Sequence, residues 1–117
     1  EGICAAHGVA GELVIEPGYP VTINDAGFTA AAAAVARELL GAEAVREMRD
    51  PTMGAEDFSY VLQRVPGAMF FLGALDPAED PATAPQNHSN RVRHHEPAMA
   101  VGAAVYAGVA LGHLAGG

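Results

Sequence analysis

Several short stretches of the chain have the hydrophobic pattern of β-strands. Leu13 and Ile15 lie on one face of residues 11–16, as expected of a half-buried strand. Residues 68–75 form a continuous apolar run, which is typical of a strand buried on both faces of a mixed or parallel sheet. The segments predicted to be extended are residues 11–16, 19–23, 44–48 and 68–75.

Between these stretches the pattern changes to that of helices. Residues 26–40 place apolar side chains on one face, with Asp25 as a predicted N-cap and Gly41 as a predicted C-cap. A second helix is predicted over residues 55–64. The last helix is predicted to start at Glu96-Pro97, where proline suits the first turn, and to run to about Leu114.

The order of these elements predicts the fold class. Strands alternate with helices, and a long polar loop at residues 76–95 precedes the last helix. Such alternation indicates an α/β layered domain with right-handed crossovers. The length of 117 residues is enough for one domain, and 50% of the residues are hydrophobic, as in globular proteins.

The charge of the chain argues against two classes of partner. With 14 acidic and 6 basic residues the formal net charge is −8. Nucleic-acid binding requires clustered Lys and Arg, so no nucleic-acid partner is expected. No polybasic stretch indicates a membrane surface, and the apolar last helix is short for a span of ~20 residues. We therefore expect neither partner.

The cysteine content and the N-terminal residues bear on where the protein is located and on whether the chain is a fragment. Cys4 is the one cysteine, which excludes an internal disulfide and a zinc ribbon. The start has no basic region and no long apolar core, so no signal peptide is recognised and a cytoplasmic location is expected. The chain starts with Glu1 instead of Met, so it is either processed or a fragment that begins inside a domain.

A polar cluster at residues 87–96 is the first candidate for chemistry. It follows the predicted buried strand, and α/β sheets place their sites at the carboxyl ends of strands. His88 is a candidate metal ligand through a neutral imidazole nitrogen, but one ligand makes no site. His94 and His95 are adjacent and point in different directions. They fit a solvated start of the last helix, and a plain loop role for His88 stays open.

Two further positions are candidates for substrate binding. Met53-Gly54 precede a predicted helix, whose free N–H groups at the first turn could bind a substrate carboxylate. Acidic residues in the same turn, Glu56 and Asp57, equally fit simple stabilisation of the helix dipole. Asn24 either caps the following helix or offers its amide to a substrate.

The hydrolases that use an activated serine, and the common nucleotide-binding folds, are excluded. No Gly-x-Ser-x-Gly is present, and Ser59 and Ser89 have no plausible base arrangement. Neither Gly-x-Gly-x-x-Gly nor a phosphate-binding loop occurs.

Taken together, four stretches resemble the metal-dependent amidohydrolase and peptidase family of hippurate hydrolases, aminoacylases and plant auxin-conjugate hydrolases. Residues 18–25 are similar to its Tyr-Pro-x-Thr-x-Asn stretch, and residues 53–58 to its Met-Gly-Ser-Glu-Asp-Phe loop. Residues 65–73 resemble its Val-Pro-Gly-x-Phe-x-Phe-Leu-Gly strand. Residues 88–96 resemble its closing His-Ser segment, although Asn90, Val92, Arg93, His94 and His95 depart from the usual pattern.

This resemblance implies a fold and a division of the chain. The expected fold is the C-terminal portion of a zinc-peptidase-like catalytic α/β domain, with a mixed sheet and flanking helices. It would be joined to the last strand of an inserted lid, or dimerisation, domain. Residues 1–19 would end the lid domain, and residues 20–117 would belong to the catalytic domain.

The resemblance also implies a function. The complete enzyme would hydrolyse the amide bond of N-acyl amino acids or small peptides with two divalent ions, zinc or manganese, and would form a homodimer or a larger assembly. By position, His88 matches a metal ligand, and Asn24, Met53 and Gly54 match the substrate site. No catalytic residue falls in this chain, so the chain alone is expected to be inactive. The alternative is a non-catalytic α/β module that associates with a partner chain.

Overall fold

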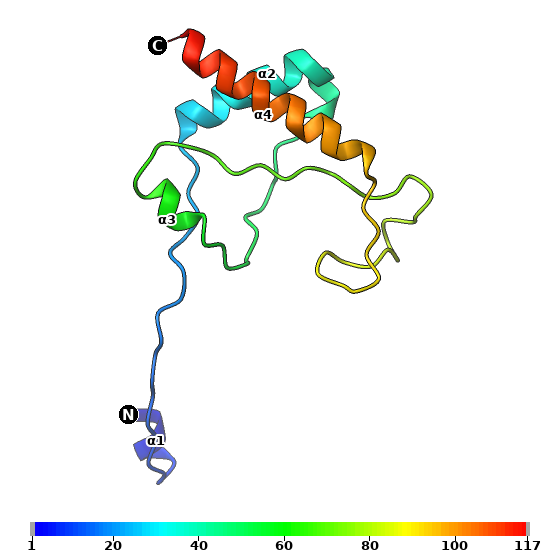
Figure 1. Cartoon of the computed structure of the whole chain (residues 1–117). Helices are drawn as coiled ribbons and strands as arrows, with labels where there is room; N and C mark the ends of the chain where they lie inside the picture. Colours follow the sequence, from blue (N-terminus) through cyan, green and yellow to red (C-terminus); the bar gives the residue numbers. More distant parts are fainter. Residues whose placement is uncertain (1, 117) are drawn as a thin grey trace.

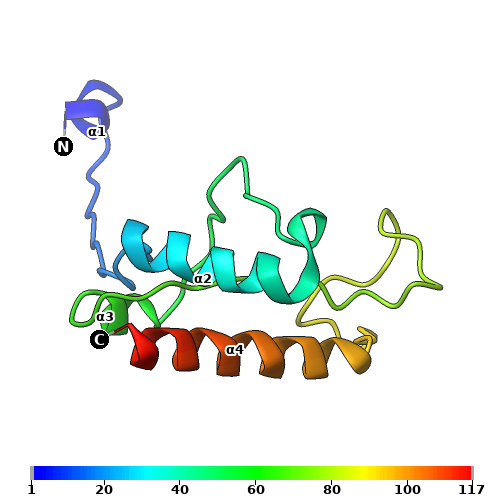
Figure 2. The ribbon, with the colours of Figure 1, turned by 90° about the horizontal axis from the view of Figure 1, so that it is seen from above.

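Two long helices form the packed part of the molecule in the computed structural model, which describes residues 2–116. Helices α2 (Ala26–Leu40) and α4 (Pro97–Ala115) lie side by side and antiparallel (Figures 1 and 2). Glycines in α4 allow the close approach: a Cβ atom built on Gly108 would lie 3.0 Å from both Val35 and Leu39 of α2. Small residues at the contact therefore set how near the two helix axes lie.

The ends of α2 are those that the sequence predicts. The side chain of Asp25 accepts a hydrogen bond from the Phe28 amide at 2.7 Å, which satisfies one of the free N–H groups of the first turn. At the other end, Gly41 has a φ of 90° and donates its N–H to the carbonyl of Arg37. A positive φ is readily adopted only by glycine, so the helix stops at this residue.

The last helix is also confirmed. It begins with Pro97 in its first turn and ends at Ala115, one residue beyond the expected limit. Residues 97–115 contain no Asp, Glu, Lys or Arg. By length and composition, α4 is the one helix of the described chain that could cross a membrane, but core helices of soluble proteins meet the same criteria. Here α4 packs along α2.

The remaining helices are short. Helix α3 covers Ser59–Leu62 only, so the prediction of a helix over residues 55–64 was too long; turns occupy the flanking positions. A 3₁₀ helix, η1 (Ala42–Ala44), follows α2 and includes the first residue of the strand predicted over residues 44–48. Residues 45–48 form no regular element, so that strand is not seen. Helix α1 (Gly2–Ala6), which was not predicted, lies at the far end of an extended segment (Figure 1).

The prediction of an α/β domain with a mixed sheet and flanking helices is wrong. Within residues 2–116, strand pairing is limited to one antiparallel bridge between Leu75 and His94. The predicted strands at residues 11–16, 19–23 and 68–75 are extended but are not paired into a sheet. An extended segment becomes a strand only when another segment satisfies its backbone groups. The pattern of apolar residues shows which segments suit a sheet but does not supply their partners.

The apolar run 68–75 shows this difference most clearly. Its side chains were expected to be buried on both faces, yet Phe71 remains 63% exposed. One side of the segment passes along α4, where the Leu72 side chain lies 3.0 Å from a Cβ built on Gly102. Leu72 itself is 50% exposed and Phe70 is 49% exposed, so the expected burial on both faces was wrong.

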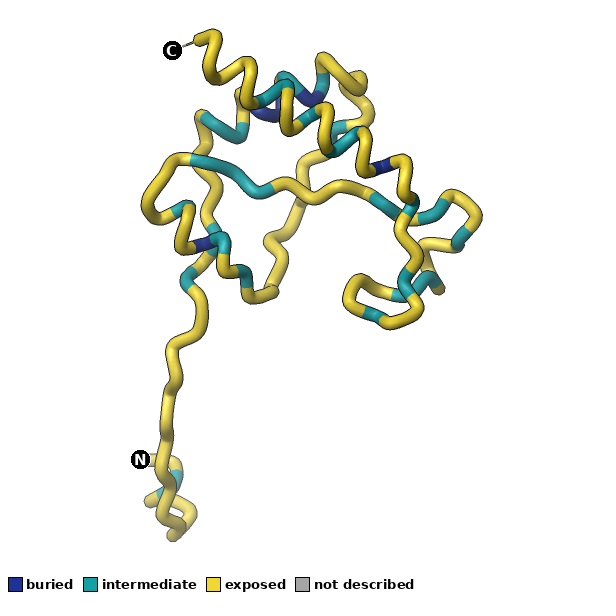
Figure 3. The backbone as a smooth tube through the Cα atoms, viewed as in Figure 1, coloured by how far each residue is buried: buried dark blue, intermediate teal, exposed yellow. Residues whose placement is uncertain are grey.

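The chain as a whole is extended (Figure 3). Its radius of gyration is 20.1 Å, whereas a compact domain of this length has about 13 Å. The accessible surface is 10011 Å², against about 5,900 Å² for a folded monomer of this mass. The buried apolar residues of the described chain are all alanines: Ala32, Ala33, Ala36 and Ala98. The assignment of residues 1–19 to a lid domain stays a prediction, and Glu1 lies outside the described residues.

Candidate functional site

Asn24 lies just before α2 and uses its side chain to hold a distant part of the backbone. Its Nδ2 donates to the carbonyl of Met69 at 3.0 Å, and the Met69 N–H donates to Oδ1 at 2.9 Å. The next residue adds a third bond, from the Asp25 N–H to the Gly67 carbonyl at 2.8 Å. The capping role considered for Asn24 falls instead to Asp25. Nothing in the spacing of the sequence signals the pairing of Asn24 with Met69, 45 residues later.

Met53 and Gly54 lie in an open loop. The Met53 side chain is 94% exposed, and a Cβ on Gly54 would meet nothing nearer than the Thr52 methyl at 3.9 Å. Space for a ligand therefore exists around Gly54. Neither Met53 nor Gly54 lines either of the two surface hollows described below.

The turn that follows the loop is occupied by the chain itself. Glu56 Oε1 accepts a hydrogen bond from the Phe58 N–H at 3.0 Å, and the Ser59 hydroxyl donates to the Glu56 carbonyl. Ser59 is fully buried. The Glu56 carboxylate thus takes one of the N–H groups that could have bound a substrate carboxylate. This arrangement fits the capping interpretation of Glu56.

His88 lies in a loop of tight turns with an unusual backbone conformation. Its φ is 72°, a value that no other non-glycine residue within residues 2–116 approaches. A left-handed conformation costs a residue with a Cβ roughly 1–2 kcal/mol. Neighbouring polar groups stabilise the turn: the Ser89 N–H donates to the Gln86 carbonyl, and the Arg91 N–H donates to the Ser89 hydroxyl.

His94 and His95 connect this loop to the rest of the molecule through their backbones. His94 forms the bridge to Leu75, and the His95 N–H donates to the Ala74 carbonyl at 2.8 Å. The His95 carbonyl then accepts from the Ala98 N–H at the start of α4. Both histidines therefore have a defined structural place at the entry to α4, as the sequence interpretation of a helix start suggested.

The described part of the chain holds an incomplete donor set for a metal ion. A zinc site needs three or four protein ligands, and residues 2–116 contain no group of three or more His, Cys, Asp or Glu residues that could hold an ion. His88 is therefore a single candidate ligand. Residues 2–116 do not by themselves fit a metal centre.

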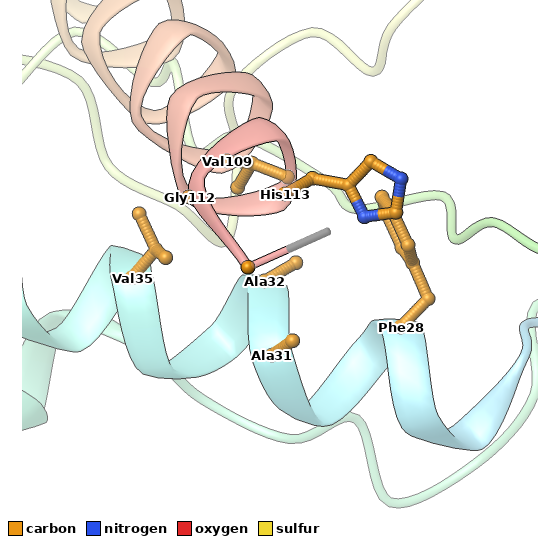
Figure 4. A pocket seen from close by; sticks show the side chains of 8 residues that line it. Phe28, Ala31, Ala32, Val35, Val109, Gly112 and His113 are labelled. Atoms are coloured by element: carbon orange, nitrogen blue, oxygen red, sulfur yellow. The ribbon is translucent and has the colours of Figure 1, made fainter.

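Two shallow hollows occur on the described surface. The first lies between α2 and α4, where Phe28 and His113 face each other with ring centroids 6.1 Å apart (Figure 4). The second has a volume of about 530 Å³ and is lined by Asn24 and by other residues drawn from the segments 21–26 and 59–66. Of the four predicted site residues, Asn24 alone lines either hollow. Neither of these two hollows therefore brings the predicted site residues together.

Comparison with known proteins identifies the class of this chain. The family model described as peptidase family M20/M25/M40 matches residues 9–112, which is most of the chain. This match includes Asn24, Met53, Gly54 and His88. The chain belongs to this family, which confirms the resemblance to metal-dependent amidohydrolases and peptidases.

Individual relatives carry hydrolase names. The chain is 37% identical over 111 residues to YhaA of Bacillus subtilis (strain 168), provisionally named an amidohydrolase, covering 95% of this chain and 27% of that protein. It is 34% identical to IAA-amino acid hydrolase ILR1-like 4 of Arabidopsis thaliana, over 85% of this chain and 22% of the relative. It is also 34% identical to thermostable carboxypeptidase 2 of Saccharolobus solfataricus, over 93% of this chain and 26% of the relative.

These comparisons also show how much of a family member is present. The chain spans about a quarter of the length of the curated relatives that it matches. No solved structure matches the chain.

Proposed function

We propose that this chain is the C-terminal part of a metal-dependent amidohydrolase that cleaves the amide bond of N-acyl amino acids or related small peptides. The observation that carries the proposal is the family match over residues 9–112, which contains every predicted site residue. The relatives' names support the reaction class, since they describe an amidohydrolase, an IAA-amino acid hydrolase and a carboxypeptidase. Because the chain spans only about a quarter of these relatives, the substrate class belongs to the proposed complete enzyme.

His88 is the residue that we assign to metal binding. Its imidazole lies in a polar loop, and its strained φ of 72° is the kind of conformation that functional sites retain. Zinc or manganese, two ions in the complete enzyme, would supply Lewis-acid chemistry. Residues 2–116 hold no group of three or more ligand residues, so completion of the site requires ligands from the rest of the proposed enzyme, to which we also assign the general base. The chain alone is therefore proposed to be inactive.

Met53 and Gly54 are proposed substrate contacts. The loop is open to solvent, and Gly54 allows close approach of a ligand to the backbone. Asn24 was grouped with them by its position in the family motif. Two of its hydrogen-bonding positions are taken up by Met69, so its carboxamide is only partly available to a substrate.

The first experiment concerns His88 in the full-length protein that contains this chain. His88→Asn removes the imidazole but keeps a residue that tolerates the left-handed conformation, so the loop is retained. Removing a group that hydrogen-bonds to a metal ligand lowers metal affinity roughly 10- to 100-fold. We expect loss of the ligand itself in His88→Asn to lower metal affinity by more than this. Metal content by mass spectrometry and hydrolysis of N-acetyl- and N-benzoyl-amino acids measure the two effects.

The matched control is His7→Asn, which changes a histidine beside α1 at the far end of the extended segment. It should leave metal content and hydrolysis unchanged. If His88→Asn also leaves both unchanged, the ligand assignment is wrong. A full-length protein that is metal-free and inert would contradict the enzyme proposal itself.

A second candidate function is a non-catalytic module that associates with a partner chain. The specific observation in its favour is exposed apolar surface, including Phe71 and Leu111, which are 63% and 69% exposed. The same surface also suits contact with further parts of one longer chain. The two candidates separate in the experiment above, because only the enzyme requires metal and hydrolysis. Homodimerisation of the complete protein is likewise a proposal, tested by its mass in solution.

A further inference from the structure

The pairing of Asn24 with Met69 has the form of strand pairing made by one side chain. A neighbouring strand would offer the Met69 backbone one donor and one acceptor, and the Asn24 carboxamide supplies both at 3.0 and 2.9 Å. The Asp25–Gly67 bond beside it strengthens the attachment. Three hydrogen bonds thus fix residues 67–69 against the start of α2.

The segment fixed at this point leads directly to the loop that carries His88. From Met69 the chain passes along α4, where Leu72 lies against Gly102. At the end of the run, the Ala74 carbonyl accepts from the His95 N–H, and Leu75 bridges His94. The loop of residues 76–93 leaves from and returns to this pair of contacts. The register of residues 68–75 therefore determines where the base of the His88 loop lies.

We propose that Asn24 is a positioning residue: its carboxamide sets the register of residues 68–75 and, through the contacts of Ala74 and Leu75, the place of the His88 loop. This inference rests on the proposed function insofar as His88 acts in it. It gives Asn24 a role other than the substrate contact indicated by its motif. It also explains why an amide is suited to this position, since only a group with both a donor and an acceptor satisfies both backbone atoms of Met69.

The substitutions that test it differ in hydrogen-bonding capacity at nearly constant size. Asn24→Asp keeps an acceptor for the Met69 N–H but turns a carboxylate oxygen toward the Met69 carbonyl, and Asn24→Leu removes both functions. The control is Asn87→Asp, in the His88 loop, for which no side-chain hydrogen bond is observed within residues 2–116. This control makes the same amide-to-carboxylate change without altering a contact to residues 67–69.

Amide hydrogen exchange and chemical shifts of the chain, measured by nuclear magnetic resonance, provide a readout that needs no activity. In the original chain we expect a slowly exchanging Met69 amide. Both Asn24 variants should speed its exchange by roughly fivefold or more, as loss of about one net hydrogen bond implies. They should also shift the signals of His88, His94 and His95. Asn87→Asp should change neither the exchange rate of the Met69 amide nor the signals of His94 and His95.

Three results would overturn the inference. A Met69 amide that is unprotected in the original chain would show that the pairing does not form. Unchanged Met69 exchange in Asn24→Asp and Asn24→Leu would show that the amide does not hold it. Faster Met69 exchange with no change at His88, His94 and His95 would restrict Asn24 to a local structural role.

Kinetics of the full-length enzyme then separate positioning from substrate contact. A positioning role predicts that Asn24→Leu lowers kcat while KM stays within about twofold, whereas loss of a substrate contact raises KM. A rise in KM with unchanged kcat would overturn the inference. If the full-length protein hydrolyses nothing, the proposed function fails, while the exchange experiment still decides whether Asn24 sets the loop.

Discussion

Single residues at the start of α2 perform separate tasks within a short distance. Asn24 holds Met69, and Asp25 caps the helix through the Phe28 amide. The Asp25 carbonyl also accepts from the Thr29 hydroxyl and amide. The sequence identified Asp25 as the cap because capping depends on residues within one helical turn. The role of Asn24 depends on a residue 45 positions away, which local pattern cannot indicate.

At this scale we predict the effect of removing the cap. Asp25→Ala leaves the Phe28 N–H without its partner and should lower the stability of α2 by about 1 kcal/mol. Circular dichroism during thermal unfolding measures the loss. Asp25→Asn is the matched control, because asparagine caps equally well and should stay near the original value. Equal stability of all three chains would contradict the capping role seen at 2.7 Å.

At the scale of elements, the two long helices form as the sequence predicts, whereas the segments predicted as strands are extended but do not pair into a sheet. A helix satisfies its backbone groups within itself, so the pattern over residues 26–40 and the proline at position 97 are sufficient to place α2 and α4. The two helices then pack through small residues: Gly108 and Gly112 of α4 face Val35 of α2. The buried residues of α2 are Ala32, Ala33 and Ala36.

The two glycines predict opposite effects on substitution. A Cβ at Gly108 would lie 3.0 Å from Val35 and Leu39, so Gly108→Val should overpack the contact and destabilise the pair by roughly 1–3 kcal/mol. At Gly112 the nearest atom is 3.6 Å away, an ordinary contact. Gly112→Ala should therefore stabilise α4 by up to about 1 kcal/mol through helix propensity. Unfolding in urea measures both, and the same sign for both would contradict the packing described.

At the scale of the whole molecule, the chain exposes far more surface than a compact domain of its length. The accessible area of 10011 Å² and the radius of gyration of 20.1 Å both exceed the values for a compact domain of this length. The outer face of α4 carries apolar residues without any charge, among them Tyr106 and Leu111. A helix that is apolar on all sides is normally buried. The isolated chain therefore exposes surface that promotes association.

This exposure predicts that the chain binds a hydrophobic dye and that the outer face of α4 tolerates a charged side chain. Leu111→Lys, on the outer face, should reduce dye fluorescence and self-association without lowering helicity. Val109→Lys is the matched comparison, because Val109 lines the hollow between α2 and α4 and should loosen the helix pair. Fluorescence, light scattering and circular dichroism measure the three effects. Similar loss of helicity in both variants would contradict the orientation of α4.

Pattern along the chain was sufficient for the features that depend on neighbouring residues or on whole motifs. It located α2 with both of its ends and the start of α4, and it indicated the family that the match over residues 9–112 confirms. Which extended segments pair became evident only from the folded chain, where pairing among the described residues is limited to Leu75 and His94. It also paired Asn24 with Met69. The physical reason is that a helix closes its hydrogen bonds within one segment, whereas an extended backbone depends on partners that lie far away in the sequence.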